Sequence, residues 1–167
     1  LGANLAMRLA ANFVITGVCQ NTPISLPACR IWPLQGSDRL ASLVRELAPK
    51  WIIHCGAASR GSWDAVEDEV DAELELRLCH TLREAAYAVG SSLTVISTDA
   101  VFAGRRGFRR EGHSTDGVSA LSQAATLVEQ ALCGTNALVV RSCIYGWSPT
   151  GGRPSFAERA WQAFSEG

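Results

Sequence analysis

The fold is indicated most clearly by the segment Val95-Ile-Ser-Thr-Asp-Ala-Val-Phe-Ala-Gly104. Residues 93–96 are apolar and β-branched in character, which is the composition that strands prefer. A polar loop, residues 97–116, follows directly. In open parallel sheets, ligands bind beyond the carboxyl ends of the strands. We therefore expect this loop to carry residues of a binding site.

Helices and strands are predicted to alternate on both sides of this segment. Further strands are expected at residues 13–18, 30–34, 51–55 and 137–140, each of which is a short apolar run. Helices are expected at residues 2–12, 63–89 and 118–133, and also between an N-cap at Ser37 and a stop at Pro49. Because parallel strands need a crossover connection, this alternation predicts an α/β fold with a parallel sheet covered by helices on both faces.

The composition is that of one globular domain and excludes several kinds of partner. The 167 residues are 47% hydrophobic and 19% charged, and 15 basic and 16 acidic residues give a net charge of -1. Such a mixture creates no field that would attract nucleic acid or an anionic membrane. No apolar run reaches the roughly 20 residues of a membrane helix, and the N-terminus lacks the features of a secretion signal. We predict a cytoplasmic protein.

Cysteine and histidine residues give no sign of a metal site. The six cysteines show no paired spacing, and most lie in apolar runs, so we expect free, buried thiols. They are Cys19, Cys29, Cys55, Cys79, Cys133 and Cys143. None of His54, His80 and His113 lies at ligand spacing from another histidine or from a cysteine pair, so no metal ligands are predicted.

Several motifs resemble those of one enzyme family. The segment that ends at Gly104 is similar to STDYVFDG, the strand-and-loop signature of dTDP-4-dehydrorhamnose reductases and their sugar-nucleotide relatives. In the same register without a gap, Glu111 and Glu129 fall on two glutamates of that family. The segment Val140-Arg-Ser-Cys-Ile-Tyr-Gly146 resembles RTSWVYG, and Ile52-Ile-His-Cys-Gly-Ala-Ala-Ser59 resembles VINAAAYT. The chain is thus similar to the extended short-chain dehydrogenase/reductase superfamily.

The resemblance implies a Rossmann-type, doubly wound parallel sheet of which this chain holds only a part. The start, Leu1-Gly-Ala-Asn-Leu5, looks like the second half of the phosphate-binding turn GxxGxLGxxL, with Gly2 as its third glycine. We then expect the first strand of the family fold to lie upstream and its C-terminal substrate-binding portion to lie outside these 167 residues. We expect residues 1–167 to be a partial NAD(P)-binding domain; the alternative is that Gly2 is an ordinary small residue at a helix start.

The resemblance also implies that the usual proton relay is missing. Family members use a Tyr to exchange a proton with the sugar carbonyl, and a Lys four residues later lowers the pKa of that Tyr. In the gapless register, these positions hold Leu121 and Ala125, neither of which is ionisable. Thr98 matches a Thr or Ser of the family whose hydroxyl also hydrogen-bonds the carbonyl oxygen of the sugar, so Thr98 is our one catalytic candidate. The alternative is that Thr98 closes the loop by a local hydrogen bond.

Cofactor and substrate residues follow from the same alignment. Cofactor-binding candidates are the residues that match the turn and the strand ends, namely Gly2, Cys55, Gly56, Ala57 and Ser97. Gln20 and Asn21, after the second strand, do not discriminate NADP from NAD. Substrate-binding candidates are Asp99, Arg105 and Arg106, because guanidinium groups match the diphosphate of a nucleotide sugar; the alternative is that the arginines form a solvated loop.

The family resemblance alone implies an active NAD(P)-dependent reductase or epimerase that acts on a nucleotide sugar, and three further functions remain open. The residues favour an NAD(P)-binding protein, related to nucleotide-sugar reductases and epimerases, whose hydride-transfer chemistry is impaired or lost. The alternative is a non-catalytic regulatory or scaffold subunit that binds a protein partner or another copy of itself, since a fold can be kept without its chemistry. The third is a partial gene product without a stable function.

Overall fold

Two parallel sheets form the centre of the molecule. A computed structural model describes residues 1–20, 24–59, 70–102, 108–148 and 154–166. The strands in these ranges are β1 (Ile15–Cys19), β2 (Cys29–Pro33), β3 (Trp51–His54), β4 (Ser92–Thr98) and β5 (Leu138–Ser142). Their order is β1-β2 in one sheet and β3-β4-β5 in the other. Every pair is parallel, as the alternation of helices and strands predicted.

The strands form two sheets instead of the one continuous sheet that was expected, and the break between the sheets has a simple explanation. In the usual doubly wound order, 3-2-1-4-5-6, the first strand lies between the second and the fourth. If β1 to β5 are counted as the second to the sixth strand, the break between β1 and β3 falls where the first strand belongs. The described strands thus form a Rossmann-type sheet without its first strand, which agrees with the predicted fold class.

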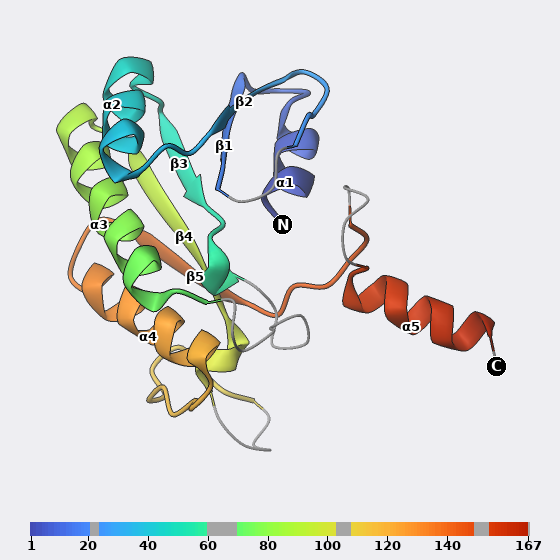
Figure 1. Cartoon of the computed structure of the whole chain (residues 1–167). Coiled ribbons are helices and arrows are strands. Elements are labelled where there is room, and N and C mark those ends of the chain that lie inside the picture. Colours follow the sequence, from blue (N-terminus) through green and yellow to red (C-terminus); the bar gives the residue numbers. More distant parts are fainter. Residues whose placement is uncertain (21–23, 60–69, 103–107, 149–153, 167) are drawn as a thin grey trace.

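Helices lie on both sides of these strands, but on the second side the helix packs beside β1 (Figure 1). One layer is formed by α2 (Ser37–Leu47), α3 (Ala72–Val89) and α4 (Ala120–Leu132), and α1 (Gly2–Leu9) lies beside β1 on the side away from α2. The last helix, α5 (Phe156–Ser165), extends away from the sheets. No helix among the described residues has both the length and the apolar character that crossing a membrane requires.

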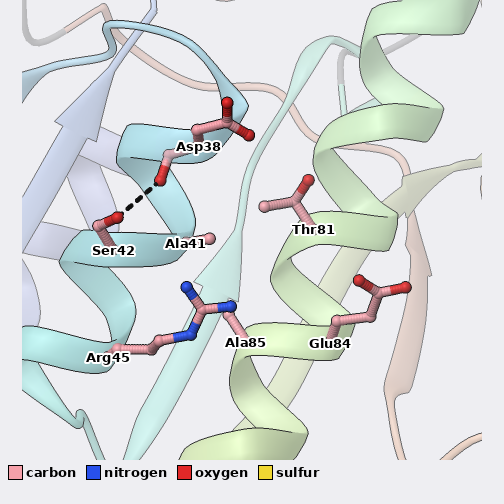
Figure 2. A pocket seen from close by; sticks show the side chains of 7 residues that line it. All are labelled: Asp38, Ala41, Ser42, Arg45, Thr81, Glu84 and Ala85. Carbon is pink, nitrogen blue, oxygen red and sulfur yellow. Dashed lines mark hydrogen bonds between the residues drawn. The ribbon is translucent and has the colours of Figure 1, made fainter.

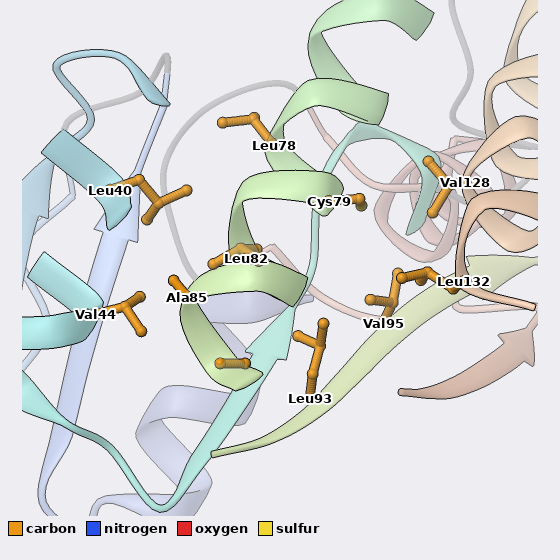
Figure 3. Close-up of a cluster of buried hydrophobic side chains, with 11 residues drawn as sticks. Leu40, Val44, Leu78, Cys79, Leu82, Ala85, Leu93, Val95, Val128 and Leu132 are labelled. Carbon is orange, nitrogen blue, oxygen red and sulfur yellow. The ribbon is translucent and has the colours of Figure 1, made fainter. Parts of the chain in front are cut away.

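The largest hydrophobic core lies between the layer of three helices and β4 (Figure 3). Each helix buries residues three or four positions apart, which form one face of a helix. The buried members are Leu40, Val44, Leu78, Cys79, Leu82, Ala85, Ala86, Leu93, Val95, Val128 and Leu132. β4 is the central strand of its sheet, and five of its seven residues are buried, all except Ser92 and Ile96.

Two helix starts differ from the sequence prediction. α3 begins at Ala72 and not at Trp63, because the Asp71 carboxylate accepts a hydrogen bond from Leu74 N at 2.9 Å and caps the helix there. Trp63 itself lies outside the described residues. Ser37 is the first residue of α2 and not its cap, which is Gly36.

All six cysteines are free, but their predicted burial was only partly right. Cys79 is fully buried in the core between α3 and the sheet. Cys133 and Cys143 are exposed, because they lie just beyond the ends of α4 and β5, where the chain leaves the core.

Candidate functional site

The carboxyl ends of β3, β4 and β5 bring together most of the predicted site residues. The parallel register aligns the ends of β4 and β5, where Thr98 pairs with Ser142. The start of α1 lies at the same edge, since a Cβ added to Gly2 would be 3.5 Å from Cys55 Cβ. Asn4 Nδ2 also donates a hydrogen bond of 3.2 Å to Trp147 O, beyond the end of β5. The segments expected to form a binding edge are therefore adjacent in space.

Gly2 and Cys55 contact each other without crowding. A Cβ at Gly2 would lie 3.5 Å from Cys55 Cβ, an ordinary van der Waals distance, so this first side-chain atom would fit beside Cys55. Burial raises the pKa of the Cys55 thiol, which keeps the sulfur neutral near neutral pH. A neutral, partly buried thiol suits a surface that a cofactor approaches closely.

Gly56 is the residue of this edge whose lack of a side chain matters most. A Cβ at Gly56 would lie 1.9 Å from Glu75 Oε1 and 2.5 Å from His54 Nε2, which is far inside van der Waals contact. The backbone at Gly56 is therefore pressed against the polar ends of two side chains, and any larger residue would have to displace them.

We predict that Gly56→Ala lowers the free energy of unfolding by about 1 to 3 kcal/mol, because the new methyl group must displace the Glu75 carboxylate. Urea denaturation followed by circular dichroism measures this. Gly112→Ala is the matched control, since no atom lies within 4 Å of a Cβ at Gly112. Equal stability of the two variants would show that the Glu75 side chain moves freely out of the way.

The pair behind Gly56 belongs to a cluster of three polar side chains, of which Glu75 and Cys79 are buried and His54 is partly buried. His54 Nε2 and Glu75 Oε1 are 2.9 Å apart, and the ligand atoms of His54, Glu75 and Cys79 all lie within 4.8 Å of one another. Burial lowers the pKa of His54, but the hydrogen bonds and charges of Cys79 and Glu75 outweigh this effect and raise the pKa to about 10. Sequence reasoning missed the cluster, although Glu75 and Cys79 stand four residues apart on a predicted helix.

Ser97 lies at the end of β4, where its hydroxyl belongs to a second polar network. Ser97 Oγ donates a hydrogen bond of 2.6 Å to Glu129 Oε1. Arg141 on β5 binds both carboxylate oxygens of Glu129, at 2.6 to 3.1 Å, and donates to Glu111 O at 3.0 Å. The Arg141 guanidinium also lies 5.0 Å from the centre of the Phe102 ring. Glu129 and Glu111 matched the family motifs, whereas Arg141 was not among the predicted site residues.

Thr98 and Asp99 follow Ser97 and form a tight turn. Thr98 is fully buried, and its hydroxyl accepts a hydrogen bond from Ala100 N and donates one to Asp99 Oδ1, both at 3.2 Å. This is the local, loop-closing role that was considered as the alternative to catalysis. The catalytic role of Thr98 and the substrate contact of Asp99 stay predictions.

Leu121 and Ala125, at the positions of the family Tyr and Lys, point into the protein interior. Their exposed fractions are 2% and 1%, and Ala125 packs against Val101 and Phe102 in a small cluster of its own. The turn after β4 therefore fills the space next to α4 with apolar side chains. Nothing at either position could transfer a proton.

The arginine-rich loop is only partly described. Arg105 and Arg106 lie outside the described residues, so their predicted contact with a substrate is untested. Arg109 forms an ion pair with Asp116, with Nη2 and Oδ2 3.1 Å apart, and its guanidinium lies 5.4 Å from the centre of the Phe102 ring. Arg109 thus packs with Phe102 on the side of the loop that faces the protein.

Two hollows of similar size lie away from this edge. The first, of about 330 Å³, lies between side chains of α2 and α3 (Figure 2). It is lined by Asp38, Ala41, Ser42, Arg45, Thr81, Glu84 and Ala85. The second, of about 310 Å³, lies over α4 beside Thr115 and Gly117. Neither contains a predicted site residue, so we place the candidate site at the carboxyl edge of the strands.

Comparisons with known proteins agree with the fold. A family model described as the RmlD substrate binding domain matches residues 1–159. A hypothetical dTDP-4-dehydrorhamnose reductase from Sulfolobus tokodaii is 19% identical, with a TM-score of 0.69, and the match covers 84% of this chain and 52% of that one. No curated protein sequence matches the chain.

Two further solved structures contain ligands. The dTDP-4-dehydrorhamnose reductase from Bacillus anthracis, in complex with NADP, is 21% identical with a TM-score of 0.67, over 93% of this chain and 61% of that one. The Bordetella bronchiseptica enzyme WbmG, in complex with NAD and UDP, is 16% identical with a TM-score of 0.65, over 90% of this chain and 52% of that one. The chain therefore spans little more than half the length of these proteins.

Proposed function

Because the chain belongs to the RmlD substrate binding domain family, we propose that it binds NAD(P) at the carboxyl edge of its strands but lacks the hydride-transfer chemistry of the reductases. One observation carries the second half of this proposal. Leu121 and Ala125 are apolar and lie in the interior, where a Tyr and a Lys would otherwise form the proton relay. Neither side chain could donate a proton to a carbonyl oxygen, as the Tyr of the reductases does.

NAD(P) binding is supported by the arrangement of the edge and by the relatives. Gly2, Cys55, Gly56 and Ala57 are small, and they lie where a parallel α/β sheet binds its ligands. The Bacillus anthracis reductase was crystallised with NADP and WbmG with NAD. Small side chains at such a turn let the backbone approach a dinucleotide.

The second ligand in the proposal is a nucleotide sugar. WbmG was crystallised with both NAD and UDP, and in this chain Asp99 follows the end of β4, next to the proposed cofactor edge. Arg105 and Arg106 follow on the same loop and would pair with a diphosphate. A cytoplasmic location is part of this proposal.

A titration tests the proposal. The full chain is titrated with NADPH and with NADH, and the fluorescence of the bound nicotinamide is followed. We expect saturable binding of at least one of the two, and no oxidation of the bound cofactor when nucleotide sugars are added. Oxidation would overturn the loss of chemistry, whereas a folded protein that binds neither cofactor would overturn the proposed cofactor site.

We predict that Gly2→Asp weakens NAD(P)H binding by about tenfold, which corresponds to about 1.4 kcal/mol, because a carboxylate at the phosphate-binding turn repels the pyrophosphate. A Cβ at Gly2 would make only an ordinary van der Waals contact with Cys55, so we expect the variant to fold. Gly112→Asp adds the same charge at an open position of an exposed loop, and it should bind like the wild type. Equal binding by both variants would place the cofactor elsewhere.

A protein partner is the second candidate function, and one observation favours it. Trp161 and Phe164 on α5 are exposed, as is Trp147, whose ring lies edge-on to that of Trp161 at 6.5 Å. Exposed aromatic clusters are frequent in protein interfaces. Sedimentation velocity separates the possibilities: concentration-dependent association of the chain, lost in Trp161→Ser, would support a homo-oligomer, and a monomer at all concentrations would not.

A further inference from the structure

We propose that His54, Glu75 and Cys79 bind one zinc ion between β3 and α3. His54 is the last residue of β3, and Glu75 and Cys79 lie one turn apart on the same face of α3. Both side chains of α3 point toward the strand, because Glu75 and Cys79 are buried. The site lies directly behind the proposed cofactor edge, where Gly56 packs against it.

The spacing of the three side chains suits a zinc ion. A tetrahedral zinc ion has bonds of about 2.0 Å to nitrogen or oxygen and about 2.3 Å to sulfur, which sets its ligand atoms about 3.3 to 3.6 Å apart. In the structure, His54 Nε2 and Glu75 Oε1 are 2.9 Å apart, and all three ligand atoms lie within 4.8 Å of one another. Small rotations of the side chains would bring the three atoms to zinc distances.

The chemistry of the ligand set selects the metal. An imidazole nitrogen, a carboxylate oxygen and a thiolate sulfur together are typical ligands of zinc, whereas magnesium and calcium take oxygen ligands. The carboxylate and the thiolate would neutralise the two charges of the ion in a buried position. Three protein ligands leave one tetrahedral position, which water can complete.

An ion pair is the competing explanation of the same geometry. A protonated His54 next to the Glu75 carboxylate would satisfy both groups, and Cys79 would be a packed thiol in the core. In that case the cluster would bind no metal, because the proton on His54 Nε2 would occupy the position of the zinc ion. The metal content of the protein therefore distinguishes the two explanations.

The test begins with the full chain and zinc alone. The protein is dialysed against EDTA, loaded with an excess of Zn²⁺ and dialysed again against metal-free buffer, and its zinc is measured by atomic absorption. We expect one zinc ion per chain. Loading with Co²⁺ in place of Zn²⁺ should produce the near-ultraviolet band that marks a bond between cobalt and a thiolate.

Variants then identify the thiolate. Cys79→Ser should lose the cobalt band, and Cys133→Ser, which removes an exposed thiol outside the cluster, should keep it. The proposal is wrong if the protein retains no zinc and the cobalt-loaded protein shows no thiolate band. It is also wrong if the band persists in Cys79→Ser. If Cys79→Ser does not fold, Glu75→Gln decides, because an unchanged cobalt spectrum in that variant would also overturn the site. None of these measurements involves a nicotinamide cofactor, so they stand independently of the proposed function.

Discussion

Replacing Ala125 by lysine is expected to lower the free energy of unfolding by at least about 4 kcal/mol, because an ammonium group would be buried without a partner. Ala125 is only 1% exposed, and it packs against Val101, which is fully buried. A buried lysine commonly titrates three or more pKa units below its usual value, and each unit corresponds to about 1.4 kcal/mol. The longer side chain must also displace packed apolar groups.

The same reasoning predicts that the proton relay cannot be restored by two substitutions. We expect Leu121→Tyr with Ala125→Lys to show no oxidation of NADPH with any nucleotide sugar, since Leu121 is also buried and the turn after β4 occupies the space beside α4. Urea denaturation gives the stability, and the absorbance of NADPH gives the activity. Gln130→Lys is the control, because Gln130 is exposed on the same helix. A stable double variant that oxidises NADPH would show that the relay is the only part that this chain has lost.

The fold could be predicted largely from local patterns in the sequence. Alternating apolar runs and amphipathic helices determine the order of the elements, and the motif around Thr98 gave the resemblance that the family match confirms. The start of α3 was predicted wrongly because apolar residues at helical spacing, Val66 and Val70, precede the true cap at Asp71. Periodicity locates a helix face, but a capping side chain locates its end.

The polar contacts of the site could not be predicted in the same way. His54 and Glu75 lie on different elements, 21 residues apart, and Ser97 and Glu129 are 32 residues apart. Such pairs follow from how helices pack on strands, which local patterns do not specify. Thr98 illustrates the limit: its residue type allowed both catalysis and a local hydrogen bond, and only the geometry shows which bonds the hydroxyl makes.

The network around Glu129 gives the second large effect that we expect. Glu129→Gln should lower the free energy of unfolding by about 1 to 3 kcal/mol, because the partly buried Arg141 would lose the carboxylate that binds it most directly and keep only the weaker interaction with Glu111. Glu129 is only 10% exposed, and its hydrogen bonds raise the pKa of the Arg141 guanidinium, which stays charged at any accessible pH. Urea denaturation of the variant measures the loss.

The control for this substitution is an ion pair of the same kind on the surface. Glu73 on α3 binds Arg77 at 3.2 Å, but its side chain is 87% exposed, so Glu73→Gln should cost less than about 0.5 kcal/mol. The difference between the two variants isolates the effect of burial, since the chemical change is identical. A similar small cost for both would mean that water reaches Arg141, and that the turn after β4 is held mainly by the packing of Val101 and Phe102 against Ala125.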